Sequence, residues 1–291
     1  MQTAIRPVRA TVIDLYDHEP NQGMRALREL LTAANGAHFA TPVTFDEYET
    51  RYLGETPGLD YDIYISSGGP GSPFAGEGQA WEMRYFDWLE SVVNHNERGH
   101  GPPKFVLFIC HSFQMMVRFF SLASVIPRTS PSFGIIPVHL TADGRRDVLF
   151  RGLPDPFYGA DFRHWQVVQP RTEVLKAMGA SILALEKARP HIPLERALMA
   201  IRLSPHLVGT QFHPEADPPG MSIHFRSDER RDGVIQRVGL AKYEQILHRL
   251  EEPDYLQRTH DTVVPRFLRQ AIAVLRPEAV AASLPVMGAV G

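Results

Sequence analysis

Residues 105–114 read FVLFICHSFQ, five apolar residues followed by a cysteine and a partly polar segment. An apolar run of this length, preceded by Pro102-Pro103, is typical of a strand that is buried on both faces of a sheet. The pattern after the cysteine predicts a helix over Ser112–Ala123. A strand followed directly by a helix indicates a parallel α/β sheet, with Cys110 at its carboxyl edge.

The segments on either side repeat this alternation of strand and helix. The sequence predicts further strands at Ala10–Leu15, near residues 40–45, at Tyr61–Ser66 and at Leu207–Phe212. One helix is predicted to begin at the N-cap Asn21, and another carries apolar residues from Trp81 to Val92 and ends at Gly99. This alternation predicts an open, mostly parallel sheet with helices on both faces, as in flavodoxin-like α/β folds.

The middle of the chain has a different pattern. From Ser132 to Val168 the sequence predicts short strands and turns, with a hairpin turn at Ala142–Gly144. Two more strands are predicted at Ile182–Leu185 and Ala197–Ile201.

The composition changes again after Glu215, so we predict one large domain over residues 8–216 and a helical C-terminal extension over residues 217–291. The charged segment Arg226–Asp232 favours a solvated loop, whereas Val234–Leu250 and Val263–Leu275 have helical spacing. We expect Val234–Leu275 to cover the domain, or to form an interface with a partner or a second copy of the chain.

Composition excludes several classes of function. The chain has 291 residues, 44% hydrophobic and 22% charged, as in ordinary globular proteins. Its net charge of -3 gives no electrostatic reason to bind nucleic acid or an anionic membrane. No apolar run reaches the roughly 18 residues of a transmembrane helix, and the N-terminus lacks the apolar core of a secretory signal. The single cysteine excludes an internal disulfide and fits a reducing compartment, so we expect a cytoplasmic protein.

The position of Cys110 favours a nucleophile. A thiol at this junction faces the helix N-terminus, whose partial positive charge favours the reactive thiolate. Such a nucleophile needs a base with an orienting group, and His213-Pro214-Glu215 offers both directly after a predicted strand. Residues i and i+2 of an extended segment project to one face, so the imidazole and the carboxylate can meet. The sequence therefore predicts a catalytic triad of Cys110, His213 and Glu215.

Acyl transfer at such a triad also needs donors for an oxyanion. The turn Gly68-Gly69-Pro70-Gly71 follows a predicted strand on the same sheet edge, where glycines allow backbone amides to approach a ligand. The thirteen histidines form no convincing set of metal ligands, so no metal site is predicted.

Three motifs together resemble the class I glutamine amidotransferase family, and they occur in the family's order. The family's oxyanion turn, Gly-Gly-Pro-Gly-x-Pro, appears as Gly68 to Pro73. Its nucleophile motif, Gly-x-Cys-x-Gly-x-Gln, appears in altered form from Phe108 to Gln114. Its closing motif, Gln-Phe-His-Pro-Glu, is complete from Gln211 to Glu215. The resemblance covers about residues 10–216.

The resemblance implies hydrolysis of glutamine, or of a related γ-glutamyl compound, through a thioester on Cys110. Ammonia would then pass to a separate synthetase subunit, since the chain has no recognisable synthetase or nucleotide module. The family also implies that the amides of Gly69 and His111 hold the oxyanion and that Gln114 lines the glutamine pocket. No cofactor is expected.

Two residues depart from the nucleophile motif, because Phe108 and Ser112 replace its glycines. We expect the Phe108 ring to point away from the thiol into the sheet packing and the elbow to be repacked. Two alternatives therefore stay open. The chain could act on another acyl compound, as γ-glutamyl hydrolases and homoserine acyltransferases do, or it could be a non-catalytic relative.

Overall fold

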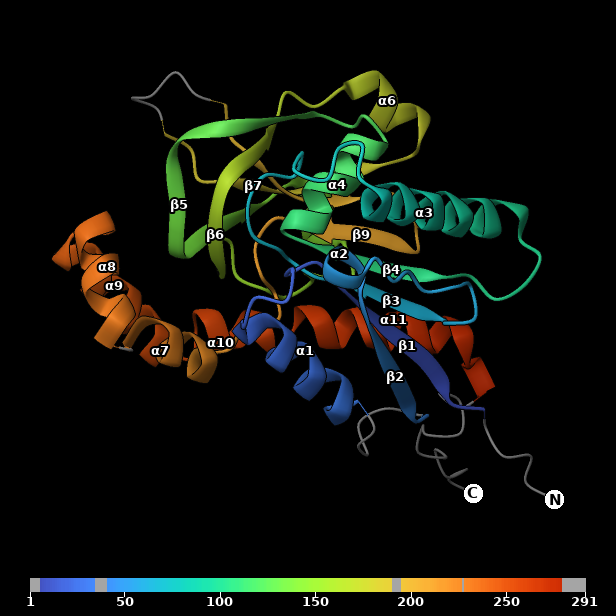
Figure 1. Ribbon diagram of the computed structural model, residues 1–291, viewed down its shortest axis with the longest axis horizontal. Helices are drawn as coiled ribbons and strands as arrows, with labels where there is room; N and C mark the ends of the chain where they lie inside the picture. The colour runs from blue at the N-terminus through green and yellow to red at the C-terminus, as the bar shows by residue number, and fades with distance from the viewer. Residues whose placement is uncertain (1–5, 35–40, 190–194, 227, 279–291) are drawn as a thin grey trace, which may run out of the picture.

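The computed structural model describes residues 6–34, 41–189, 195–226 and 228–278. Within these residues the strands form one nine-stranded sheet, ordered β2-β1-β3-β4-β9-β8-β7-β5-β6 (Figure 1). The strands are β1 (Val8–Asp14), β2 (Val43–Glu49), β3 (Ile63–Ser66), β4 (Phe105–Ile109), β5 (Ser124–Leu140), β6 (Phe157–Val168), β7 (Ser181–Glu186), β8 (Leu198–Arg202) and β9 (Leu207–Thr210).

The two halves of the sheet differ in strand direction. The pairs from β2 through β1, β3 and β4 to β9 are parallel. The pairs from β9 through β8, β7 and β5 to β6 are antiparallel. The predicted fold class, an open α/β sheet with parallel strands and helices on both faces, is confirmed, and the antiparallel half extends it.

Helices cover both faces of the parallel half. The helices of the described residues are α1 (Gln22–Ala33), α2 (Thr50–Leu53), α3 (Ala80–Arg98), α4 (His111–Phe119), α5 (Ala142–Arg146), α6 (Thr172–Ala177), α7 (Pro218–Arg226), α8 (Asp228–Val238), α9 (Leu240–Glu251), α10 (Leu256–His260) and α11 (Val263–Leu275). Helices α1 and α11 lie on one face and α3 and α4 on the other (Figure 1). Leu107 and Ile109 of β4 join the α1/α11 core, whereas Val106 and Phe108 join the α3/α4 core. This alternation explains the continuous apolar run, because both faces of β4 are buried.

The predicted helix boundaries agree with local capping. Asn21 is the N-cap of α1, and its side-chain Oδ1 accepts a hydrogen bond from the Met24 amide at 2.8 Å. Gly99 ends α3 in the left-handed conformation, with φ 63°. Helix α4 is shorter than predicted, because β5 begins at Ser124 after only a few connecting residues.

The middle of the chain differs from the prediction of short strands and turns, which was wrong. The 17-residue β5 and the 12-residue β6 form one long antiparallel pair, with a register shift between Pro127 and Ser132. The predicted hairpin turn at Ala142–Gly144 is instead the first turn of α5. Thr141 caps this helix, since its Oγ1 accepts a hydrogen bond from the Gly144 amide at 3.0 Å.

The C-terminal helices pack on two different parts of the fold: α11 packs in the core with α1, and α7 to α10 pack on the β5/β6 pair. Buried residues of α7 to α10, such as Phe225 and Tyr243, share a cluster with Ile135 and Ala160 of the β5/β6 pair. The predicted loop at residues 226–232 was wrong, because residues 228–238 form α8, but Arg226, Arg231 and Asp232 are exposed to solvent as predicted. Among the described residues, no helix has the length and apolar character needed to cross a membrane.

Candidate functional site

The sheet order brings the three sequence motifs to one edge. Strands β3, β4 and β9 are neighbours and parallel, so their carboxyl ends lie side by side. The glycine turn follows β3, Cys110 follows β4, and His213 follows β9. The structure therefore brings together the residues that were predicted as a triad and its oxyanion turn.

Cys110 forms a sharp elbow between β4 and α4. Its backbone has φ 51° and ψ −96°, a conformation that costs energy for a residue with a β-carbon. Two hydrogen bonds hold it there: the Cys110 amide donates to the Thr210 carbonyl at 2.8 Å, and the Cys110 carbonyl accepts from the Gln114 amide at 3.1 Å. The thiol consequently lies at the N-terminus of α4, where the helix dipole favours negative charge on sulfur.

His213 and Glu215 form a buried hydrogen-bonded pair. The Nδ1 atom of His213 lies 2.7 Å from Oε1 of Glu215. Backbone contacts fix both residues, because the His213 amide donates to the Ala160 carbonyl at 2.8 Å and the Glu215 carbonyl contacts Nδ1 of His260 at 2.9 Å. Since Nδ1 is bound to the carboxylate, Nε2 of His213 is the ring nitrogen left for Cys110 or a substrate.

The pKa of His213 lies well above its usual value. Burial lowers this pKa, but the Glu215 carboxylate and the Cys110 sulfur, through charge and hydrogen bonding, raise it by more. The imidazole is therefore held as an imidazolium beside the sulfur. A thiolate and an imidazolium in contact are the pair that nucleophilic cysteine chemistry requires.

Two glycines of the turn after β3 are required by close packing. A β-carbon at Gly68 would lie 2.6 Å from Cε1 of His213, and one at Gly69 would lie 2.4 Å from the Leu15 carbonyl oxygen. Two arginines hold the turn: Arg51 donates to the Pro70 carbonyl at 2.7 Å, and Arg118 donates to the Pro73 carbonyl. The turn is thus fixed against the imidazole.

Phe108 and Ser112 fit a repacked elbow. Phe108 is buried in the α3/α4 core, so its ring points away from the thiol as predicted, and Gly209 on the neighbouring strand leaves space beside it. Ser112 accepts a hydrogen bond from the Ile109 amide at 2.8 Å and donates to the Ser66 carbonyl at 2.7 Å. Its hydroxyl therefore ties the start of α4 to the ends of β3 and β4.

The side chains of His111 and Gln114 are turned away from the open part of the site. His111 is buried, and burial together with the charges of Arg51 and Arg118 lowers its pKa to about 3. Gln114 donates through Nε2 to Oε1 of Gln211 at 3.0 Å and to the Trp165 carbonyl at 3.4 Å. Neither residue lines the cavity that opens above Cys110.

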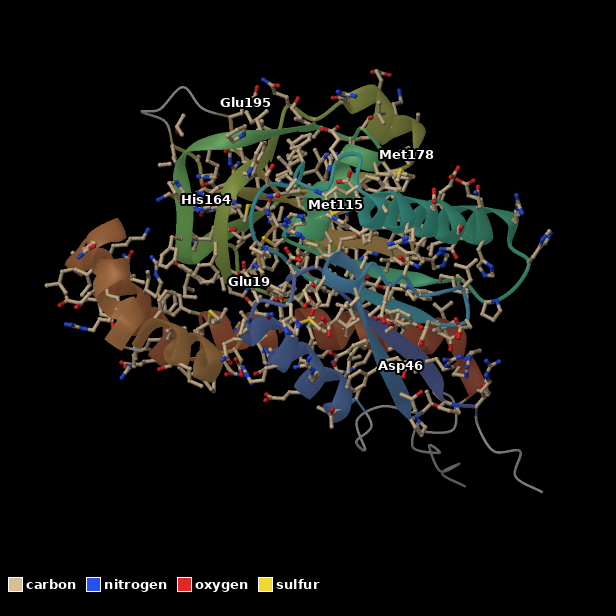
Figure 2. All side chains as sticks on the ribbon, in the orientation of Figure 1. Glu19, Asp46, Met115, His164, Met178 and Glu195 are labelled. Atoms are coloured by element: carbon tan, nitrogen blue, oxygen red, sulfur yellow. The ribbon has the colours of Figure 1, made fainter. Side chains whose placement is uncertain are left out.

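That cavity has a volume of about 680 Å³ and contains Cys110, His213, Glu215 and Gly69 in its wall. The loop after β1 contributes Glu19, and β6 contributes His164, both labelled in Figure 2. A further part of the wall is apolar and comes from the β5/β6 pair and α7: Phe133, Phe162, Met221 and Ile223. The first helix of the predicted extension is thus part of the cavity.

Two residues at the site were given no role from sequence, Tyr16 and Gln211. Tyr16 follows β1, and a β-carbon on Gly23 would lie 2.6 Å from its hydroxyl and 3.2 Å from Oε1 of Glu215. Burial and the charges of Glu215 and Cys110 raise the pKa of Tyr16 well above its usual value, so the phenol stays protonated. The available signal was position at the end of a buried parallel strand, since Gln211 directly follows β9 and Tyr16 lies two residues after β1. Among the described residues, no group of three potential metal ligands occurs.

A family model described as "Glutamine amidotransferase class-I" matches residues 25–229. A search of curated proteins finds no match to the chain.

Several solved structures share the fold. A glutamine amidotransferase from Thermotoga maritima is 17% identical, with a TM-score of 0.62, and the match covers 92% of this chain and 99% of that one. A glutamine amido transferase from Methylobacillus flagellatus is 14% identical, with a TM-score of 0.57 and coverage of 92% and 93%. The glutaminase domain of CTPS from Trypanosoma brucei, solved with bound acivicin, is 15% identical, with a TM-score of 0.52 and coverage of 72% and 86%.

Proposed function

Because the chain belongs to the class I glutamine amidotransferase family, we propose that it hydrolyses glutamine with Cys110 as the nucleophile and passes ammonia to an acceptor enzyme. The observation that carries the proposal is the elbow conformation of Cys110 beside a hydrogen-bonded His213–Glu215 pair in one cavity wall.

The charges of the pair suit the first half of the reaction. The Cys110 thiolate attacks the carboxamide carbon of glutamine, and the carbonyl oxygen becomes an oxyanion. The His213 imidazolium then gives its proton to the departing amine, so ammonia leaves and a γ-glutamyl thioester remains. Glu215 keeps the ring in one tautomer and stabilises its charge.

The second half returns the enzyme to its starting state. His213, now neutral, takes a proton from a water molecule that attacks the thioester, and glutamate leaves as the thiolate re-forms. We assign the oxyanion to the backbone amides of Gly69 and His111, which belong to the turn after β3 and the first residue of α4. Donors at a helix N-terminus and in a fixed turn need no reorganisation when the charge develops.

A separate synthetase subunit is the acceptor that we propose, and a reducing compartment such as the cytoplasm would keep the thiol available. Residues 217–291 would then cover the domain and supply α7 to the cavity mouth, where a partner could control access. The chain could also form a homo-oligomer.

Ammonia release from glutamine by the purified chain tests the proposal directly. The wild-type chain should release ammonia and glutamate in equal amounts, faster when its synthetase is added. The Cys110→Ala variant should release neither. A wild-type chain that reacts with a generic thiol reagent, but releases no ammonia and is not labelled by a glutamine-like electrophile with candidate partners present, would rule out glutamine as the substrate.

A second candidate is hydrolysis of a larger γ-glutamyl conjugate. The cavity, at about 680 Å³, lies within the range of roughly 300–1,000 Å³ found for pockets that enclose drug-sized ligands. Its wall includes Phe133, Phe162 and Met221, and glutamine has only two methylene groups to place against them. An apolar leaving amine would fill this side of the cavity.

The chromogenic compound γ-glutamyl-p-nitroanilide distinguishes the two candidates, because its leaving amine carries an aromatic ring. Faster release of nitroaniline from the anilide than of ammonia from glutamine would favour the conjugate hydrolase. In that case Phe162→Ala should raise KM for the anilide while leaving glutamine turnover nearly unchanged. Faster reaction with glutamine than with the anilide would reject this candidate.

A further inference from the structure

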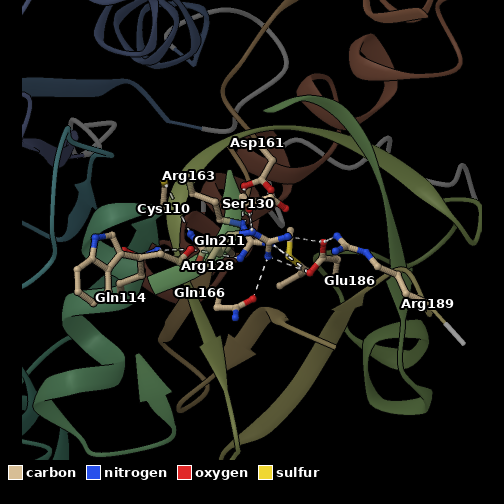
Figure 3. A network of polar contacts seen from close by, with 12 residues as sticks. Cys110, Gln114, Arg128, Ser130, Asp161, Arg163, Gln166, Glu186, Arg189 and Gln211 are labelled. Atoms are coloured by element: carbon tan, nitrogen blue, oxygen red, sulfur yellow. Dashed lines mark hydrogen bonds and ion pairs between the residues drawn. The ribbon is translucent and has the colours of Figure 1, made fainter. Parts of the chain in front are cut away.

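A chain of amide side chains leads from the Cys110 sulfur into the protein (Figure 3). Nε2 of Gln211 lies 3.8 Å from the Cys110 Sγ, and Oε1 of Gln211 accepts a hydrogen bond from Nε2 of Gln114 at 3.0 Å. The same Nε2 of Gln114 donates to the backbone carbonyl of Trp165 at 3.4 Å. Gln211 and Gln114 are both buried, so their orientation matters for the site.

The Trp165 carbonyl sets the direction of both amides. A backbone carbonyl can only accept hydrogen bonds, so the end of Gln114 that faces it must be the NH₂ group. This NH₂ group also faces Gln211, whose nearest atom must then be the carbonyl oxygen. The opposite end of the Gln211 carboxamide is a donor, and it is the end that faces the sulfur. Reversing either amide would place two acceptors or two donors against each other.

The Trp165 carbonyl is itself held by charged groups deeper in the fold. Arg163 donates to it through Nη1 at 3.4 Å, and the Arg163 Nε is bound to both oxygens of Asp161 at 3.0 and 2.9 Å. Asp161 and Arg163 are almost completely buried, so this anchor is rigid. The orientation of Gln114 is therefore fixed by a buried ion pair, and Arg163 of that pair also contributes to the cavity wall.

We propose that the Gln211 carboxamide is a third stabiliser of the Cys110 thiolate, besides His213 and the N-terminus of α4, and that Gln114 is a positioning residue that aims it. The inference rests on the proposed function, in which Cys110 is the nucleophile. Gln211 directly follows β9 and His213 lies two residues further on, so both reach the sulfur from the segment after the same strand. A hydrogen bond to a charged acceptor is stronger than one to a neutral acceptor, so this contact favours the thiolate over the thiol.

The pH dependence of Cys110 alkylation by iodoacetamide tests this role in the full chain, without any substrate. The chain has one cysteine, so the reaction reports on Cys110 alone. The Gln211→Met variant keeps the length of the side chain but removes the donor. It should raise the apparent pKa of the Cys110–His213 pair by about one unit, which slows alkylation roughly tenfold below that pKa and leaves the plateau at high pH unchanged.

Gln114→Met should raise the same pKa by a smaller amount, since Gln211 remains but is no longer aimed. The double variant should match Gln211→Met, because the two residues act through one contact. Gln166→Met is the matched control: Gln166 accepts from Arg128 in the same network at 3.0 Å and should leave the alkylation profile unchanged.

The outcomes separate this inference from the proposed function. A shifted alkylation profile without glutamine turnover in the wild type would keep the inference and reject glutamine as the substrate. A wild-type profile in both folded variants, Gln211→Met and Gln114→Met, would overturn the inference whatever the turnover. If Gln211→Met fails to fold, Gln114→Met carries the test, since it leaves Gln211 in place.

Discussion

Cys110 keeps a conformation that its own β-carbon disfavours, and the surrounding residues explain why the chain tolerates it. The Thr210 carbonyl binds the Cys110 amide, while Ser112 clamps the end of β4 from the following turn. Strain of this kind persists only where neighbouring contacts determine it, and it is found most often at functional sites. The sequence correctly predicted Cys110 at a strand end. It could not predict that the Ser112 hydroxyl would hold the elbow through hydrogen bonds to the ends of β3 and β4.

The triad roles of Cys110, His213 and Glu215 stay a prediction that substitution tests. Cys110→Ala should reduce turnover by roughly 10⁴-fold or more while leaving the melting temperature nearly unchanged, because one small side chain replaces another. His213→Ala should be comparably damaging. Glu215→Gln should retain more activity, since the ring keeps a hydrogen-bond partner. Steady-state turnover beside a thermal melt measures both effects, and full activity in Cys110→Ala would remove the triad assignment.

His111 predicts a dependence of stability on pH. Its pKa is about 3 in the fold and about 6.5 in an unfolded chain, so the unfolded state binds a proton first as the pH falls. The contribution of His111 to the free energy of unfolding is complete above pH 6.5. It is lost as the pH falls from 6.5 to 3, at up to about 1.4 kcal/mol per pH unit.

Urea unfolding from pH 7 to pH 4 measures the effect. His111→Gln should flatten the loss of unfolding free energy on the acid side, and His164→Gln, at the exposed rim of the cavity, controls for removing a histidine. Parallel curves for wild type and His111→Gln would show that His111 is not held neutral.

At the scale of elements, prediction succeeded where one segment carried its own signal. Strands β1, β3, β4 and β9 were recognised because each is a short, largely apolar run, whereas the more polar β2 was predicted only in part. Helices α1 and α3 were recognised because Asn21 and Gly99 mark their ends. It failed in the β5/β6 pair, where residues such as Pro127 and Ser132 suggest turns in isolation. Pairing with the partner strand overrides that local signal. The charged residues of α8 led to the wrong prediction of a loop for a similar reason. A tertiary contact outweighs the local signal, because the buried Val234 of α8 packs in a cluster with Phe225.

The packing between β4 and β9 yields a prediction at this scale. Phe108 replaces a glycine of the family motif, and Gly209 lies opposite it in the sheet register. A β-carbon on Gly209 would lie 2.6 Å from Cδ2 of Phe113, so Gly209→Ala should destabilise the fold by about 1–3 kcal/mol and disturb the elbow.

Gly233→Ala in α8 is the matched control, because a β-carbon there would meet open space. It should be neutral or stabilising by up to about 1 kcal/mol. Chemical denaturation of both variants measures the difference, and equal effects would argue against the close packing of α4 on β9.

At the scale of the whole molecule, the domain boundary at residues 216/217 stays a prediction; the family model extends to residue 229, and later helices pack on the sheet. Helix α11 lies beyond that boundary, yet its buried residues Phe267, Leu268 and Ile272 belong to the same core as α1 and β4. Sequence could show that α11 is amphipathic but not which surface it covers, because its partners in α1 and β4 lie far earlier in the chain. The same limit applies to α7, whose Met221 lines the cavity.

Removal of everything after Gly220 should therefore make the chain insoluble or unfolded, since it exposes the face of the sheet that α11 covers. Two point variants test, without truncation, whether α11 stabilises the domain. Phe267→Ala should cost about 3–5 kcal/mol, because the ring is buried, whereas Val274→Ala, half-exposed on the same helix, should change the free energy of unfolding by about 0.5 kcal/mol or less. Equilibrium denaturation separates them. If the truncated chain stayed folded, with unchanged mass and activity, α11 would be an appendage that docks on a domain complete without it.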